Sequence, residues 1–131
     1  MSEHSVLIVD DDEGLVQIIS LILRQEDFGV RTAINGMRGH ADYSLNPTEW
    51  VITDIQMPEL DGLQMMQCIR SINPRVKAIY MSGQLDKYQA ELQQEVSEFD
   101  ARLLPKPFTK SDLIGQLTVE RCRLTENNSK H

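Results

Sequence analysis

Short apolar runs alternate along the chain with segments of helical periodicity. Four runs are almost continuously apolar, at residues 6–9, 50–53, 78–81 and 103–105. Continuous runs of this length are typical of strands that are buried on both faces of a sheet. A fifth run, residues 30–34, alternates apolar and polar positions, which is typical of a half-exposed edge strand. The pattern therefore predicts five strands, with the second in the sequence at an edge.

Between these runs, apolar residues recur at the spacing of one helix face. The expected helical stripes are Leu15, Ile18, Ile19 and Ile22; Leu63, Met66, Ile69 and Ile72; Leu92, Val96 and Phe99; and Leu113, Ile114, Leu117 and Leu124. A weaker helix is expected over residues 36–44. Gly29 is expected to close the first helix, and the Asn-Pro pairs at 46–47 and 73–74 to end the second and third.

Five strands in strict alternation with five helices predict one α/β domain with a parallel sheet, right-handed crossovers and helices on both faces. Placing the edge-like run outermost favours a flavodoxin-like (βα)5 three-layer sandwich with strand order 2-1-3-4-5. Its switch point then lies between the first and third strands. We expect the domain to span residues 1–124, with residues 125–131 as a polar, frayed tail.

Composition narrows the class of protein. The chain has 131 residues, with 13 Lys and Arg against 20 Asp and Glu, for a net charge of −7. This balance argues against direct DNA binding through a basic face. Cys68 and Cys122 are expected to be buried thiols rather than a disulfide or a zinc site. The sequence shows neither an apolar stretch long enough to span a membrane nor a signal peptide, so a cytoplasmic location is expected.

Carboxylates follow the first and third strand-like runs. Asp10 and Asp11 come directly after the first run, and Asp54 after the third. Open α/β sheets bind ligands at the carboxyl ends of the strands beside the switch point, so these side chains are expected to converge. Such a cluster suits a hard divalent cation such as Mg²⁺. Both features also have a simpler interpretation. The acidic run at residues 10–13 would be the N-terminus of a helix, and Asp54 would be a turn residue.

Ser82 and Lys106 follow the fourth and fifth runs. Lys106 lies between Pro105 and Pro107, which stiffen the backbone around it. Beside a carboxylate cluster it would supply a point charge for phosphate oxygens, whereas elsewhere it would be an ordinary loop lysine. Ser82, followed by glycine, would otherwise be a turn residue. Together with the carboxylates, these residues complete a set that suits phosphoryl transfer.

In their order along the chain, these motifs resemble the receiver domain of bacterial two-component response regulators, of the chemotaxis-receiver type. The matching segments are Asp10-Asp11, residues 54–58 followed by Asp61-Gly62, Ser82-Gly83, and Lys106-Pro107-Phe108. The resemblance covers nearly the whole chain. It implies a domain that accepts a phosphoryl group and is not an enzyme, apart from catalysing its own phosphorylation and dephosphorylation.

The resemblance also implies roles for the clustered residues. Asp54 would accept a phosphoryl group from a sensor histidine kinase or a histidine phosphotransfer protein. Asp11, Asp54 and the main-chain carbonyl of Gln56 would bind Mg²⁺, for which Mn²⁺ could substitute. Asp10 would act mainly through water.

Ser82 and Lys106 would hold the phosphoryl oxygens, and Lys106 is expected to serve the phosphorylated state more than the fold. Ser82 and Leu103 would form the switch. Receivers often carry Tyr or Phe where this chain has Leu103, so an aromatic switch is missing from that position. The signal is expected to reach an unidentified downstream protein through the surface of the fourth helix, fifth strand and fifth helix. The domain would be a monomer or a phosphorylation-dependent dimer.

Two alternatives use similar residues. A small magnesium-dependent phosphatase of the haloacid dehalogenase type also has an aspartate nucleophile, but its first motif ends in Thr or Val where this chain has Gly14. The chain also offers no insertion for a substrate cap. A nucleotide-binding module is disfavoured because no glycine-rich loop follows the first strand.

Overall fold

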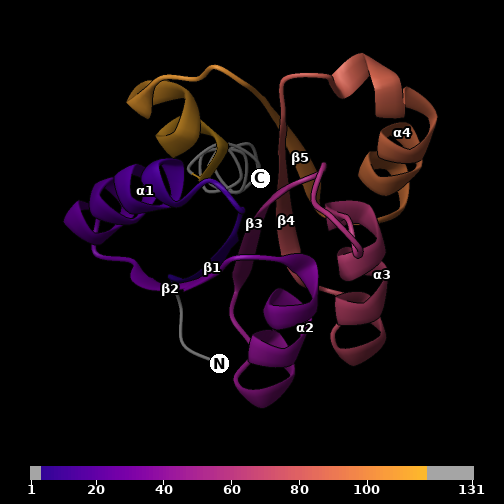
Figure 1. The fold of residues 1–131 in the computed structure, drawn as a ribbon, viewed down its shortest axis with the longest axis horizontal. Coiled ribbons are helices and arrows are strands. Elements are labelled where there is room, and N and C mark those ends of the chain that lie inside the picture. The colour runs from indigo at the N-terminus through magenta and orange to yellow at the C-terminus, as the bar shows by residue number, and fades with distance from the viewer. Residues whose placement is uncertain (1–3, 118–131) are drawn as a thin grey trace, which may run out of the picture.

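The structure, a computed structural model, describes residues 4–117. In chain order its elements are β1 (Ser5–Val9), α1 (Glu13–Gln25), β2 (Gly29–Ala33), α2 (Gly36–Leu45), β3 (Trp50–Asp54), α3 (Gly62–Ile72), β4 (Lys77–Ser82), the 3-10 helix η1 (Leu85–Tyr88), α4 (Gln89–Glu98) and β5 (Ala101–Pro105). A last helix is described over residues 110–117. Figure 1 shows the strands in the middle of the domain, with helices on either side of them.

The five strands form one parallel sheet in the order β2-β1-β3-β4-β5. This confirms the predicted fold class and strand order. Every residue of β1 and β3 is buried, whereas β2 has exposed positions, as expected for an edge strand. The register aligns the carboxyl ends of the strands: Val9 lies opposite Ala33 and Thr53, and Ser82 lies opposite Pro105.

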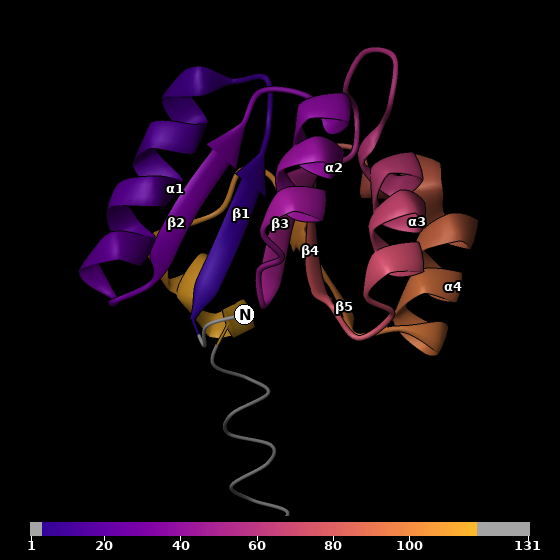
Figure 2. The same cartoon turned by 90° about the horizontal axis from the view of Figure 1, so that it is seen from below.

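Helices cover both faces of the sheet and enclose two cores. One core packs α2, α3 and α4 against the sheet, and its large buried side chains include Tyr43, Met65 and Tyr80. The other packs α1 and the last helix against the opposite face, around Ile19 and Leu113. Figure 2 shows α1 on one side of the strands and α3 and α4 on the other. Burial of apolar side chains in these two layers supplies the main stabilisation of the fold.

Local sequence signals position most helix ends. The side chains of Asp12, Asn35, Asp61 and Thr109 each accept a hydrogen bond from the backbone N–H three residues later, which caps four helices. The two Asn-Pro pairs end α2 and α3 as predicted.

The end of α1 differs from the prediction. Asp27 adopts the left-handed conformation, with φ of 67°, that follows many helix ends. Its N–H donates to the carbonyl of Arg24, and the N–H of Phe28 donates to that of Leu23. Gly29 is instead the first residue of β2, so the prediction that it closes the helix was wrong.

The apolar stripes are confirmed at most positions and wrong at three. Ile18, Ile72 and Val96 are 59%, 44% and 48% exposed. Near Ile72 and Val96, inward-facing positions are taken by charged residues, namely Arg70 and Glu95. Periodicity locates a helix face only approximately, and Arg70 and Glu95 can face inward because they pair with each other.

Some sequence-based expectations lie outside the described residues, namely those on Leu124, Cys122 and the tail at 125–131. Cys68 on α3 is a free thiol, as predicted, but it is partly exposed, so the prediction that it is buried was wrong. Among the described helices, none has the length and apolar character needed to cross a membrane.

Candidate functional site

Three carboxylates meet at the carboxyl ends of β1 and β3. Asp10 follows β1 directly, Asp11 comes next, and Asp54 is the last residue of β3. One carboxylate oxygen from each lies within 4.8 Å of the others. Asp10 is 1% exposed and Asp54 9% exposed, whereas Asp11 is exposed. The convergence expected from the strand order is therefore present in the structure.

The acidic run after β1 divides into two parts. Asp10 and Asp11 face the cluster, whereas Asp12 caps α1 by accepting a hydrogen bond from Leu15 N–H at 3.1 Å. Glu13 lies in the first turn of α1, where the helix dipole favours a negative charge. The second half of the run thus forms the acidic N-terminus of α1, while the first half joins the carboxylate cluster.

Lys106 provides the cation of this site. It follows β5, and its Nζ lies 3.1 Å from Asp10 Oδ2 and 3.4 Å from Asp54 Oδ1. The lysine side chain is 24% exposed, so the pairs lie at the edge of the protein rather than in its centre. Because Asp10 is almost fully buried, these ion pairs also offset the charge of the carboxylates in the fold.

The electrostatics of the site follow from burial and crowding. Burial raises the pKa of Asp54, and the neighbouring charge of Asp10 raises it further, against the opposing effect of Lys106. For Lys106, burial alone would lower the pKa, but attraction to and hydrogen bonds with Asp10 and Asp54 outweigh it, so the pKa of Lys106 is raised. The lysine therefore stays charged, while the folded protein disfavours the ionised form of Asp54.

The loop after β3 is held against the site by a close backbone approach. A Cβ atom on Gly62 would lie 2.2 Å from the carbonyl oxygen of Asp54, so only glycine fits here. The N–H of Gly62 donates to the carbonyl of Ile55 at 2.9 Å. Gln56 lies in this loop, two residues after Asp54, and is exposed.

Ser82 ends β4, the strand next to β3. It is 2% exposed, and its hydroxyl accepts a hydrogen bond from the N–H of Gln84 at 2.8 Å. The side chain of Gln84 in turn accepts one from the Gln56 amide at 3.2 Å. Sequence reasoning did not foresee this contact between glutamines. The signal that could have shown it is their matching position, two residues after polar groups on adjacent strands.

Leu103 lies in β5 and is half-buried. It lines a hollow of about 500 Å³ between η1, α4 and β5. The other lining residues are Leu85, Asp86, Gln89, Leu92, Gln93, Val96 and Ser97. The predicted switch position therefore faces a largely apolar groove beside α4.

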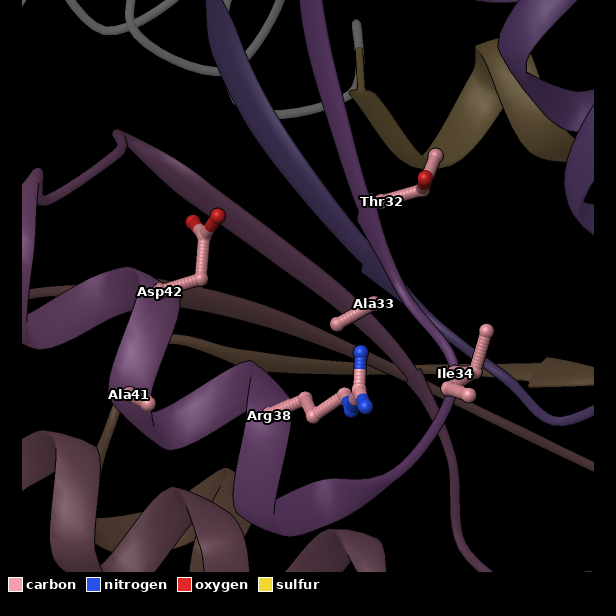
Figure 3. A pocket seen from close by; sticks show the side chains of 6 residues that line it. All are labelled: Thr32, Ala33, Ile34, Arg38, Ala41 and Asp42. Carbon is pink, nitrogen blue, oxygen red and sulfur yellow. The ribbon is translucent and has the colours of Figure 1, made fainter.

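A second hollow, of about 360 Å³, lies between β2 and α2. In Figure 3, Arg38 and Asp42 of α2 lie on one side of the hollow, and Ala33, the last residue of β2, and Ile34, which follows it, lie on the other. Asp42 is already bound by Arg31, whose Nη2 lies 2.6 Å from its carboxylate. None of the clustered carboxylates lines this hollow, so it is separate from the acidic site.

A comparison with protein-family models agrees with this site. The model described as the response regulator receiver domain matches residues 6–118. The chain therefore belongs to the response regulator receiver domain family, whose members act in two-component signalling with histidine kinases. The phosphatase alternative is not supported.

Individual relatives lead to the same family. The transcriptional regulatory protein GlrR of Escherichia coli is 34% identical over 110 residues, which are 82% of this chain and 24% of that protein. A signal receiver domain from Bermanella marisrubri is 31% identical, with a TM-score of 0.75 over 88% of this chain and 96% of its own. The receiver domain of sensor histidine kinase PA1611 from Pseudomonas aeruginosa, solved with magnesium in its active site cleft, is 22% identical with a TM-score of 0.76, over 89% of this chain and 96% of its own.

The chain spans 24% to 53% of the length of the first curated relatives that it matches. Those relatives are regulators with further sequence beyond the part that corresponds to this chain.

Proposed function

We propose that this chain accepts a phosphoryl group on Asp54 from a phosphohistidine of a sensor histidine kinase or a histidine phosphotransfer protein. The observation that supports this most is the convergence of Asp10, Asp11 and Asp54 within 4.8 Å, beside the charged Lys106. The domain is proposed to span residues 1–124, with the tail at 125–131 outside it.

In the transfer, an oxygen of the Asp54 carboxylate forms a bond to phosphorus while the bond between phosphorus and the donor imidazole nitrogen breaks. The imidazole keeps the electron pair of that bond and takes up a proton, and the product is an acyl phosphate. Asp54 is suited to this attack because it is largely buried but keeps part of its surface open at the edge of the sheet. Lys106 and the Ser82 hydroxyl are proposed to hold the phosphoryl oxygens.

The donors at the site fit a hard divalent cation. Three carboxylate oxygens from separate residues can approach one ion, and the exposure of Asp11 leaves space for retained waters, as Mg²⁺ prefers. We propose that Asp11, Asp54 and the Gln56 carbonyl bind Mg²⁺ or Mn²⁺, with Asp10 acting through water. The ion would neutralise the negative charge that otherwise keeps phosphoryl oxygens away from the carboxylates.

The test is labelling with a small phosphodonor such as acetyl phosphate, followed by intact-mass measurement. The wild type should gain the mass of one phosphoryl group with Mg²⁺ and lose that gain with chelator. Asp54→Asn should gain nothing, whereas Asp86→Asn, which changes an exposed aspartate outside the site, should behave as the wild type. Equal labelling of Asp54→Asn and the wild type would overturn the assignment.

We further propose that the signal leaves through the output surface, defined as α4, β5 and the last helix, toward an unidentified downstream protein or a second copy of the chain. The groove lined by Leu92, Val96 and Leu103 on this surface supports the proposal. Ser82 and Leu103 would form the switch, and the domain itself would not bind DNA. Amide exchange before and after phosphorylation should change mainly between residues 83 and 117. Changes confined to α1 and β2 would point to another surface.

A further inference from the structure

A buried polar cluster ties α4 to the rest of the domain. Arg70 of α3 forms an ion pair with Glu95 of α4, and the hydroxyl of Tyr80 on β4 donates to the same carboxylate oxygen. Arg70 Nη1 also donates to the Tyr80 hydroxyl at 3.3 Å. Arg70 is 7% exposed, Tyr80 0% and Glu95 9%. We call this cluster the Glu95 latch.

The latch is poorly explained as a device for stability. A buried ion pair often contributes less than well-packed apolar side chains, because both charges must leave water. Here Nε and Nη2 of Arg70 are buried and have no hydrogen-bond partner among the described residues. The Phe99 ring, 4.1 Å from the guanidinium carbon, compensates for them only in part. Burial raises the pKa of Tyr80, so its hydroxyl keeps the proton that it donates.

The helix that the latch holds has few other attachments. Only Leu92 and Glu95 are buried among the ten residues of α4. The helix follows η1 directly, and no side chain caps its start. Glu95 is therefore one of only two inward anchors of α4, and it is the only one that forms directional bonds.

The latch also connects α4 to the strand that leads to the acidic site. Tyr80 lies two residues before Ser82 on β4, so the two side chains point to the same face of the sheet. In the sheet register Tyr80 lies directly opposite Leu103, and both belong to the core beneath α4. Position 103 has no aromatic ring, but Tyr80 on the neighbouring strand supplies one, and its hydroxyl is bound to Glu95 of α4.

We propose that the Glu95 latch holds α4 in place in the unphosphorylated chain, and that a shift of β4 at Ser82 acts on α4 through Tyr80. The second clause rests on the proposed phosphorylation of Asp54, whereas the first does not. The latch would thereby couple the site to the output surface in a chain that has leucine at position 103.

The test is Tyr80→Phe, which keeps the ring and removes the hydrogen bond to Glu95. In the unphosphorylated protein, amides of residues 89–98 should exchange about ten-fold faster than in the wild type. Tyr43→Phe is the matched control, because Tyr43 is equally buried but its hydroxyl accepts from Asn73 rather than contacting α4. It should leave the exchange of α4 unchanged. Wild-type exchange of α4 in Tyr80→Phe would overturn the latch.

The second comparison uses the same proteins after acetyl phosphate treatment, with the intact mass recording the phosphorylated fraction. Wild-type α4 should exchange faster once Asp54 is phosphorylated. Tyr80→Phe should be phosphorylated to the same extent but show little further change in α4. A full wild-type response in Tyr80→Phe would overturn the coupling. Failure of the wild type to gain a phosphoryl group would overturn the proposed function, while the unphosphorylated comparison would still decide the latch.

Discussion

Two clusters of charge border β4, and they are composed in opposite ways. The acidic site, at the carboxyl edge of the sheet, sets three carboxylates against the single cation of Lys106. The Glu95 latch, between α3, α4 and β4, pairs one carboxylate with one guanidinium and one neutral phenol.

Exposure separates the clusters further. Asp11 and part of Lys106 reach water, whereas all three residues of the latch are nearly buried. An open cluster with surplus negative charge can take up a cation, and a closed, balanced one can only hold its own partners together. This difference indicates that the acidic site is suited to binding a cation and the Glu95 latch to positioning α4. The following changes test this distinction.

The largest effect is expected from breaking the latch on one side. Glu95→Leu leaves the Arg70 guanidinium buried without its partner, so the free energy of unfolding should fall by about 3 kcal/mol. Replacing both partners, as Arg70→Met with Glu95→Leu, should restore most of that loss. Urea unfolding of the single and double variants measures this coupling. Equal destabilisation of both variants would show that the two charges do not depend on each other.

A somewhat smaller effect is expected from the loop that frames the acidic site. Gly62→Ala forces a methyl group against the Asp54 carbonyl, which should lower the free energy of unfolding by about 2 kcal/mol. Gly29→Ala is the matched control, because no atom lies within 4 Å of a Cβ placed there. The same urea titration applies, and a loss of similar size in both variants would show that the close approach is not the cause.

The acidic site and the Glu95 latch also differ in how far the sequence could predict them. The acidic site follows from chain order alone, because its residues lie at or just after the carboxyl ends of strands, and parallel strands end at one edge of the sheet. The capping side chains were likewise local signals. Their partners lie only three residues away, so no knowledge of the tertiary structure was needed to expect them.

The latch could not be predicted in that way. Arg70 and Glu95 are 25 residues apart in the sequence, and each would suit a solvated helix face. Their burial depends on how α3 and α4 rotate against each other, which periodicity does not determine to within one position. The exposure of Val96, next to buried Glu95, is a direct consequence.

Removing the cation of the acidic site should cost less than breaking the latch. Lys106→Ala leaves Asp10 and Asp54 without their ion-pair partner, but the site borders water and Asp54 can take up a proton. The sequence alone predicts almost no effect on the fold, but because Lys106 pairs with Asp10 and Asp54 in the structure, we expect a loss of about 1 kcal/mol in the free energy of unfolding without Mg²⁺. Lys110→Ala, which changes an exposed lysine of the last helix, should have no such effect. A loss for Lys106→Ala as large as that for Glu95→Leu would remove the distinction between an open and a closed cluster.

The smallest effect is expected from neutralising Asp54, and its sign is opposite. Burial, and after it the charge of Asp10, raises the pKa of Asp54 in the folded protein. Asp54 therefore holds a proton more tightly in the folded protein than in the unfolded chain. This contribution to stability is fully present below the ordinary aspartate pKa and is lost as the pH rises through the raised one. At neutral pH without Mg²⁺, Asp54→Asn should therefore unfold at a slightly higher temperature than the wild type, and the difference should vanish on acidification. Added Mg²⁺ should stabilise the wild type more than the variant, since it binds the folded carboxylates. Thermal unfolding across pH, with chelator or with Mg²⁺, measures both trends. If the variant were less stable than the wild type at neutral pH without Mg²⁺, ionised Asp54 would stabilise the fold rather than destabilise it.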